Sequence, residues 1–325
     1  MKFGRVVKLL GRCGMNRKIL VTGGNGFIGS HVVRQLLSQG DKPILLIRET
    51  SDMWRLKNIL NNLKVFNINE QQLSEVFESE DLSGVINLAT YYRKHSVFED
   101  IDKMIYSNVT FPSQILHLCK ENNVPTFITA GSYFQYRASS FLSDINSDIP
   151  RDLYAATKSA LLKIMDYYAA GSNLNSIELI LFTPYGPMDH DEKLIPYIIQ
   201  NALSGKSLNL TSGFQKLNLV YVGDVAKAFL QALDYPKNSE TTVRLNVANT
   251  CSYSIRDIIT VMEEIFQKHI DVNWSSILTN EIDKEYSLDV DSQKIEEDLK
   301  WKPKFNIYKG LKRTIEYYKG NLDGN

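Results

Sequence analysis

Hydrophobic and polar positions along this chain follow two alternating periods. Short apolar, β-rich runs are separated by segments in which apolar residues recur at helical spacing. This rhythm is typical of βαβ units, and it predicts an α/β fold with a doubly wound parallel sheet. The predicted strands are Lys18–Val21, Pro43–Ile47, Lys64–Asn67, Val85–Leu88, Thr126–Thr129 and Glu178–Phe182. The predicted helices between them are His31–Ser38, Gln72–Glu78, Ile101–Glu121 and Tyr154–Ala169.

The rhythm loosens after Phe182. A turn cluster is expected at Thr183–Pro187, and Ser254 with Asp257 predicts a capping box that opens a helix ending near Gln267. We therefore expect a second, smaller lobe that is interleaved with the first. Its further predicted elements are helices at Lys193–Leu203, Asp224–Leu233 and Tyr308–Tyr318 and strands at Leu219–Tyr221 and Leu245–Ala248.

A glycine-rich segment connects the first predicted strand to the first predicted helix. Glycines at this spacing let the backbone approach a pyrophosphate, and the helix N-terminus supplies positive potential. A tight turn without a ligand would also use glycine, but the strand on either side at the expected distance favours a dinucleotide site. The predicted loop residues are Gly23, Asn25, Gly26, Phe27, Ile28 and Gly29.

Arg48 ends the second predicted strand, nineteen positions after Gly29. An acidic residue near this position would hold the ribose 2′-hydroxyl of NAD. A guanidinium instead pairs with a 2′-phosphate or stacks on adenine, so Arg48 favours NADP over NAD. Glu49 is the next residue and could hold the ribose of NAD, so NAD remains an alternative cofactor. Arg48 could also be a solvated charge at the end of the strand, with no role in binding.

Three residues suggest hydride-transfer chemistry. Tyr154 and Lys158 are four apart, so they share one face of a helix, and Ser132 comes after an apolar run. We expect the ammonium to lower the pKa of Tyr154, which then exchanges a proton with a carbonyl oxygen. Ser132 would polarise the same oxygen, and Lys158 would also hold the nicotinamide ribose. A chance Tyr-x-x-x-Lys spacing on a solvated helix is the alternative.

Composition narrows the class of protein further. Lys plus Arg and Asp plus Glu both number 37, so the net charge is zero and no nucleic acid or anionic membrane is indicated as a partner. Three scattered cysteines at 13, 119 and 251 suit a reducing compartment, and we expect a cytoplasmic protein. No metal site is predicted, because His190 has no second histidine at ligand spacing and His31 fits packing at a helix start. Residues 1–14 are interpreted as an extension without function.

Several further segments resemble the extended short-chain dehydrogenase/reductase superfamily, in its nucleotide-sugar epimerase/dehydratase/reductase branch. The likeness covers almost everything from Lys18 to Tyr318 and implies a Rossmann domain with a smaller C-terminal lobe for a nucleotide-diphosphate sugar. On this basis residues 15–182, with returns near 217–250, form the dinucleotide-binding domain, and 183–216 with 251–325 form the sugar lobe. The segments that carry the resemblance are Asn67-Ile68, Asn87-Leu88-Ala89-Thr90, Asn108, Tyr185-Gly186-Pro187, Leu219 to Asp224, Asn246-Val247 and Trp301-Lys302-Pro303.

The resemblance also implies roles for individual residues. Asn67 and Ile68 would face adenine, although the family usually has Asp where Asn67 stands. The cofactor ribose and the sugar would be lined from the segment after the fourth strand and from the aromatic residues after Ser132. A homodimer through Ile101–Glu121 and Tyr154–Ala169 is expected. The implied lining residues are Leu88, Ala89 and Thr90 for the cofactor and Tyr91, Tyr133 and Phe134 for the substrate. Tyr92 and Tyr136 are further candidates for the wall of the sugar pocket, and ordinary core packing is the alternative for some of these aromatic residues.

The three residues after Ser132 narrow the choice among members of the superfamily. Dehydratases normally have an acidic pair there, whereas this chain has Tyr133, Phe134 and Gln135. The segment is most similar to nucleotide-sugar 4-keto-6-deoxyhexose reductases, the CDP-abequose synthases among them. Reduction of such a keto sugar with NADPH or NADH is therefore expected. An NAD-dependent C4 epimerase and a non-catalytic dinucleotide-binding protein are the alternatives.

Overall fold

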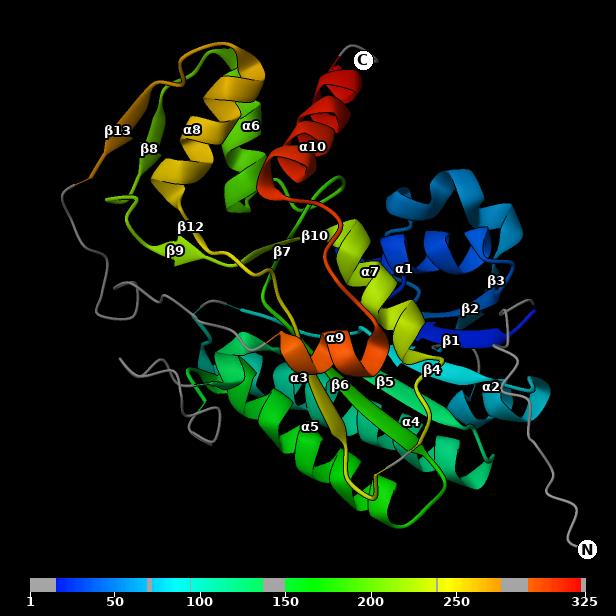
Figure 1. The fold of residues 1–325 in the computed structure, drawn as a ribbon. Coiled ribbons are helices and arrows are strands. Elements are labelled where there is room, and N and C mark those ends of the chain that lie inside the picture. Colours follow the sequence, from blue (N-terminus) through cyan, green and yellow to red (C-terminus); the bar gives the residue numbers. More distant parts are fainter. Residues whose placement is uncertain are drawn as a thin grey trace, which may run out of the picture.

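The computed structural model describes residues 16–68, 72–93, 95–136, 150–237, 239–275 and 292–322, so the extension at 1–14 lies outside the described part. Within these ranges, seven parallel strands form one sheet in the order β11-β6-β5-β4-β1-β2-β3 (Figure 1). This arrangement confirms the predicted doubly wound fold. The strands are β1 (Lys18–Thr22), β2 (Lys42–Ile47), β3 (Lys64–Asn67), β4 (Gly84–Asn87), β5 (Thr126–Ser132), β6 (Asn175–Leu181) and β11 (Val243–Val247).

Helices cover both faces of this sheet (Figure 1). One face is packed by the 3-10 helix η1 (Trp54–Asn62) and by α1 (Phe27–Ser38), α7 (Val222–Ala232) and α9 (Gln293–Leu299). The opposite face is packed by α2 (Leu73–Ser79), α4 (Phe111–Glu121) and α5 (Leu153–Ala170). Alternating strand residues supply the two apolar cores, because successive side chains of a strand point to opposite faces.

A third apolar core lies beside the carboxyl edge of the sheet. It is built by α6 (Leu194–Ser204), α8 (Ile255–Phe266) and α10 (Ile307–Leu322). Short strand pairs flank these helices: β7 (Thr183–Tyr185) with β10 (Leu219–Tyr221), β8 (Leu208–Leu210) with β13 (Val272–Trp274), and β9 (Lys216–Leu217) with β12 (Tyr253–Ser254). In the described ranges no helix is both apolar and long enough to cross a bilayer.

The sheet with its helices and the third core are connected at Asp224, in the first turn of α7. The buried Trp301 donates its indole N–H to the Asp224 carbonyl over 2.9 Å. The Asp224 carboxylate accepts the backbone N–H groups of Lys304 and Phe305 at 3.0 and 2.9 Å. The segment that leads from α9 to α10 is therefore fixed to the start of α7.

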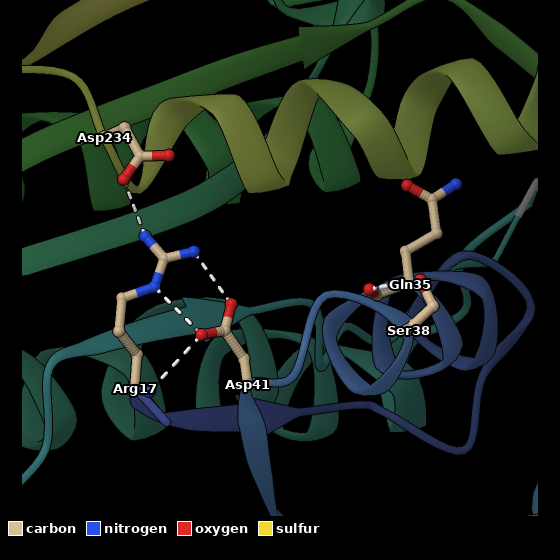
Figure 2. Close-up of polar contacts among 5 residues, drawn as sticks. All are labelled: Arg17, Gln35, Ser38, Asp41 and Asp234. Carbon is tan, nitrogen blue, oxygen red and sulfur yellow. Dashed lines mark hydrogen bonds and ion pairs between the residues drawn. The ribbon is translucent and has the colours of Figure 1, made fainter. Parts of the chain in front are cut away.

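Arg17 ties the start of the sheet to the far end of α7. Its guanidinium pairs with Asp41 at 2.8 Å and with Asp234 at 2.7 Å (Figure 2). Gln35 donates to the Gly223 carbonyl at 2.8 Å, further along the same α1–α7 contact. Polar contacts thus hold α7 at both of its ends.

Some elements differ from the expectations of the sequence. Thr183–Tyr185 is a strand paired with β10 and not part of a turn, and β5 continues to Ser132. The helix predicted at Ile101–Glu121 is α3 (Ile101–Ile105) and α4, joined by a π-helical turn at Tyr106–Thr110. The capping box is confirmed: the Asp257 N–H donates to the Ser254 hydroxyl at 3.0 Å, and the Ser254 N–H donates to the Asp257 carboxylate.

Candidate active site

The glycine loop forms a tight turn between β1 and α1. Gly23 has φ +64°, and a Cβ there would lie 2.6 Å from the Ala89 nitrogen. A Cβ on Gly29 would lie 2.1 Å from the Gly23 carbonyl oxygen, so only glycine fits. Gly26 is the N-cap of helix α1, which has no side-chain cap and no acidic residue in its first turn. Its uncapped N–H groups suit an anionic group, which fits the pyrophosphate of a dinucleotide.

The other residues predicted to bind the cofactor come after neighbouring strands. Arg48 lies just past β2, and its N–H donates to the Ser51 hydroxyl at 3.0 Å. Asn67 ends β3, and the Ile68 N–H donates to the Ile47 carbonyl at 3.0 Å. These strands are parallel, so their carboxyl ends meet at one edge of the sheet, where open α/β sheets bind ligands.

The segment after β4 is held against the glycine loop. The Ala89 N–H donates to the Thr22 hydroxyl at 3.1 Å, and that hydroxyl donates to Asn87 Oδ1 at 2.7 Å. Leu88 donates its N–H to the Thr22 carbonyl at 3.1 Å. Leu88 and Ala89 therefore lie beside the glycine loop, and Thr90 follows them in the chain.

Ser132 is the last residue of β5 and is 8% exposed. Its hydroxyl oxygen accepts the Phe134 N–H at 3.3 Å, and its own N–H donates to Gln135 Oε1 at 2.6 Å. The Ser132 O–H remains available to donate to a substrate oxygen. The backbone after β5 thus orients the hydroxyl of Ser132.

Tyr154 and Lys158 lie on the first turns of α5. Asp152 caps this helix by accepting the Ala155 N–H at 2.8 Å, which fixes where the helix begins. The Lys158 Nζ lies 5.6 Å from the centroid of the Tyr154 ring. The helix contacts the turn just past Ser132, so the structure brings all three predicted catalytic residues to the same edge of the sheet.

The pKa values at the site differ from the sequence-based expectation. Burial raises the pKa of Tyr154 to about 12, partly offset by a hydrogen bond with the Thr90 side chain. Burial lowers the pKa of Lys158 to about 8, partly offset by the negative charge of Glu178. The expectation of a lowered Tyr154 pKa is not met in the cofactor-free protein, because the loss of solvation dominates the shift. Tyr154 is consequently protonated near neutral pH.

Asn108 organises the site, although the sequence predicted no role for it beyond the resemblance. Its Oδ1 accepts from the Thr90 hydroxyl at 2.9 Å and from the Tyr91 N–H at 2.8 Å. Its Nδ2 donates to the Tyr91 carbonyl and to the Thr157 hydroxyl, both at 3.0 Å. Asn108 lies in the π-helical turn, a kind of helix distortion that is frequent at functional sites. It connects the segment after β4 to helix α5.

The aromatic residues predicted to bind substrate contact different kinds of side chain: an acid, an aromatic ring and a guanidinium. The Tyr91 hydroxyl donates to the buried Asp100 at 2.7 Å. Tyr133 stacks on Phe182 with centroids 5.5 Å apart, as a core residue does, and the Phe134 ring lies 3.2 Å from the Arg151 guanidinium. The ring in contact with Tyr154 belongs to Tyr92, edge to face at 4.9 Å.

The histidines set aside in the sequence have structural contacts. His31 Nε2 lies 2.9 Å from the Pro187 carbonyl, and burial lowers the pKa of His31 to about 4. The His190 N–H donates to the Asp189 carboxylate at 2.8 Å. Across the ranges that the structure covers, no group of three His, Cys, Asp or Glu side chains is arranged to hold a metal ion.

The glycine loop, the hydroxyl at the end of β5 and the Tyr–Lys pair on α5 define an enzyme of the extended short-chain dehydrogenase type. A family model described as "NAD dependent epimerase/dehydratase family" matches residues 19–248. The chain belongs to this family, which confirms the resemblance inferred from the sequence.

The similar proteins include CDP-abequose synthases and UDP-glucuronate 4-epimerases. The chain is 28% identical over 266 residues to a CDP-abequose synthase of Yersinia pseudotuberculosis, covering 82% of this chain and 90% of that one. It is also 28% identical over 322 residues to a UDP-glucuronate 4-epimerase of Thermodesulfobacterium geofontis, covering 94% and 97%. Among solved structures, a UDP-glucuronic acid 4-epimerase from Bacillus cereus, in complex with UDP-glucuronic acid and NAD, superposes with a TM-score of 0.81 at 25% identity, covering 94% and 99%.

Proposed function

We propose that this enzyme reduces a nucleotide-diphosphate 4-keto-6-deoxyhexose to the 4-hydroxy sugar with NADPH or NADH, in the synthesis of deoxysugars for a surface polysaccharide. The proposal places the enzyme in the cytoplasm, and it assigns the dinucleotide to residues 15–182 and 217–250. The sugar nucleotide is assigned to residues 183–216 and 251–325. The similarity to CDP-abequose synthases over most of both chains supports the assignment.

The observation that carries the proposal is the set of contacts made directly after Ser132. Tyr133 stacks on Phe182, and Phe134 lies against Arg151. Gln135 is 3% exposed and bonds to the Ser132 N–H. None of these three side chains is a carboxylic acid, and their contacts occupy them structurally. The elimination of water thus has no acid and base at this position, whereas reduction needs only the hydroxyl, the phenol and the ammonium.

Three side chains would share the work of reduction. A reduced nicotinamide held at this site would supply the hydride. Ser132 donates a hydrogen bond to the C4 carbonyl oxygen, which polarises the carbonyl. Tyr154 gives its phenolic proton to the same oxygen as negative charge develops there. Lys158 holds the nicotinamide ribose, and its positive charge stabilises the phenolate that remains.

In the protein without cofactor, burial raises the pKa of Tyr154 to about 12, so its phenol carries the proton that reduction would consume.

Arg48 supports NADPH as the preferred reductant, and its replacement tests this preference. Arg48→Ala should raise the Kd of NADPH about 10- to 100-fold, since a charge-assisted hydrogen bond contributes about 1.5–3 kcal/mol. The Kd of NADH should change less than about threefold. Both dissociation constants are measured by nicotinamide fluorescence. Lys57→Ala, which removes one positive charge from η1, is the control variant. Equal weakening of both cofactors would instead assign Arg48 to adenine stacking.

A C4 epimerase is the second candidate, favoured by the similarity to UDP-glucuronate 4-epimerases over nearly the whole chain. The same hydroxyl, phenol and ammonium would serve an epimerase. The two reactions differ in the fate of the hydride, because an epimerase returns it to the sugar from which it came.

Isotope transfer separates these two reactions. The protein is incubated with deuterated NADPH or NADH and freshly prepared CDP- or dTDP-4-keto-6-deoxyglucose, and the product is analysed by mass spectrometry and NMR. Deuterium at C4 of a deoxyhexose product supports reduction. Conversion of a UDP-hexose without deuterium uptake would establish epimerisation and refute the reductase.

We also propose a homodimer formed through α3 and α5. Large apolar side chains are exposed on α3, on the π-helical turn after it and on α5: Ile105 is 41% exposed, Tyr106 55% and Tyr167 67%. Ile105→Glu should raise the dissociation constant of the dimer at least tenfold, a cost of about 1.4 kcal/mol. Light scattering across a dilution series measures this. Phe214→Glu, at a 58% exposed aromatic residue outside these elements, should leave the mass unchanged. A native protein that is monomeric at micromolar concentration would refute the dimer.

A further inference from the structure

A row of polar side chains crosses the sheet beneath the active site. Five neighbouring strands place these residues side by side in register, from β1 through β4, β5 and β6 to β11. Such a row is unusual in a parallel sheet, whose strands are normally apolar on both faces. In strand order the row consists of Thr22, Asn87, Thr129, Glu178 and Arg244.

Glu178 is the buried charge in this row, with 1% of its surface exposed. Its Oε2 accepts the Arg244 Nε–H at 2.8 Å, and its Oε1 accepts from Gln135 Nε2 at 2.9 Å. Space for this carboxylate comes from Gly131, where a Cβ would lie 2.8 Å from Glu178 Oε1. The neighbouring strand is thus shaped around the acid.

Gln135 connects this carboxylate to the catalytic hydroxyl. The side-chain amide of Gln135 donates to Glu178 and, through Oε1, accepts the Ser132 N–H at 2.6 Å. The Glu178 charge fixes which way this amide faces, since only its NH₂ group can donate to a carboxylate. With the amide in this orientation, Gln135 Oε1 accepts the Ser132 N–H. Glu178 therefore holds, through Gln135, the turn that positions the Ser132 hydroxyl.

Glu178 also acts on the catalytic ammonium. Lys158 lies on α5, the helix that packs on the same face of the sheet, and is 4% exposed. Among the described residues, the charged or titratable groups around Lys158 are Tyr154 on its own helix, Glu178 on β6, and Arg244 behind Glu178 on β11. The carboxylate is the negative charge that favours the protonated form of Lys158.

We propose that Glu178 is a positioning residue of the reaction, which orients Ser132 through Gln135 and places a negative charge on the face of the sheet that carries Lys158. The inference rests on the proposed function in one respect, that Ser132 and Lys158 act in catalysis. A purely structural account explains the residue less well. A buried ion pair contributes little net stability, and an apolar residue on β6 would pack against α5 without losing solvation. If Glu178 served packing alone, an apolar residue such as valine at this position would give a more stable protein.

The first test follows Lys158 directly in the cofactor-free protein. The protein is labelled with [ε-¹³C]lysine, the Lys158 signal is assigned by its loss in Lys158→Met, and its chemical shift is followed with pH. In E178Q the Lys158 signal should titrate at lower pH than in the native protein, because the nearby negative charge is gone. R244K, which keeps both charges, should titrate like the native protein. An unchanged titration in E178Q would overturn the link to Lys158.

The second test measures the link to Ser132. E178Q should lower kcat about tenfold or more with KM changed less than threefold, since a misplaced catalytic group costs rate and not substrate binding. Gln135→Met leaves the Glu178–Arg244 pair in place, so it should lower kcat similarly while leaving the Lys158 titration unchanged. Gln135→Met also tests the contact chain if E178Q does not fold. Native kcat in Gln135→Met, or in a folded E178Q, would overturn the link to Ser132. Because the titration needs no substrate, an error in the proposed function would appear separately, as absent turnover in the native protein.

Discussion

Tyr154→Phe is expected to lower kcat about a thousandfold, within the range of 10² to 10⁴ that a positioned proton donor contributes. The phenol oxygen is the only atom lost, and the ring can keep its edge-to-face contact with Tyr92. The Kd of the dinucleotide should therefore change less than about twofold. Turnover is measured with saturating cofactor, and cofactor binding is measured by fluorescence on the same sample.

Tyr168→Phe is the matched control for this variant. Tyr168 lies on the same helix and packs edge to face on Tyr167, without a predicted role in the chemistry. Its kcat should stay within about twofold of the native value. If Tyr154→Phe retained more than a tenth of the native kcat, Tyr154 would not be the proton donor. If the native protein showed only binding and no turnover, the chain would be a non-catalytic dinucleotide-binding protein.

Lys158→Met is expected to stabilise the protein while abolishing its activity. Burial lowers the pKa of Lys158 to about 8 from 10.5, so the charged form is less stable in the folded protein than in the unfolded one. At pH 7 this difference corresponds to about 3 kcal/mol, which the variant should recover in large part. Glu178 stays paired with Arg244 and Gln135, so no unpaired charge is left behind.

The stability gained by Lys158→Met should depend on pH, because Lys158 has different pKa values in the folded and unfolded states. The folded-state pKa lies below the unfolded-state pKa, so unfolding takes up a proton between pH 8 and 10.5. The native protein therefore bears the full penalty below pH 8 and none above about 10.5. The difference in free energy of unfolding between Lys158→Met and the native protein, from urea titrations, should shrink across this range. Lys163→Met, at an exposed position on the same helix, should show no difference. A less stable Lys158→Met at pH 7 would contradict the account.

The sequence predicted the sheet well because its signals are local. Apolar runs of strand length and helical periods alternate from Lys18 onward, and each predicted strand of the main sheet is present to within a few residues. The strand Thr183–Tyr185 was wrongly predicted as a turn, because its proline and glycine neighbours suggest a turn while its pairing with β10 comes from a distant segment. The π-helical turn at Tyr106–Thr110 was missed, since a change of hydrogen-bond register leaves the apolar spacing almost intact.

The candidate site was predictable where its chemistry shows in short motifs. The glycine loop and the Tyr154–Lys158 spacing are of this kind. The proposed role of Glu178 was not predictable, because its partner Arg244 is 66 positions away and meets it through the register of β6 and β11. The raised pKa of Tyr154 was missed for a related reason: spacing shows that Lys158 is near, but not how deeply both groups are buried.

The most direct test of the central claim is the oxidation of NADPH and NADH at 340 nm with CDP- and dTDP-4-keto-6-deoxyglucose, with the product identified in parallel. We predict one NADPH consumed per deoxyhexose formed with at least one of these substrates. Conversion of a UDP-hexose with catalytic NAD and no net oxidation would contradict the reductase assignment and identify a C4 epimerase.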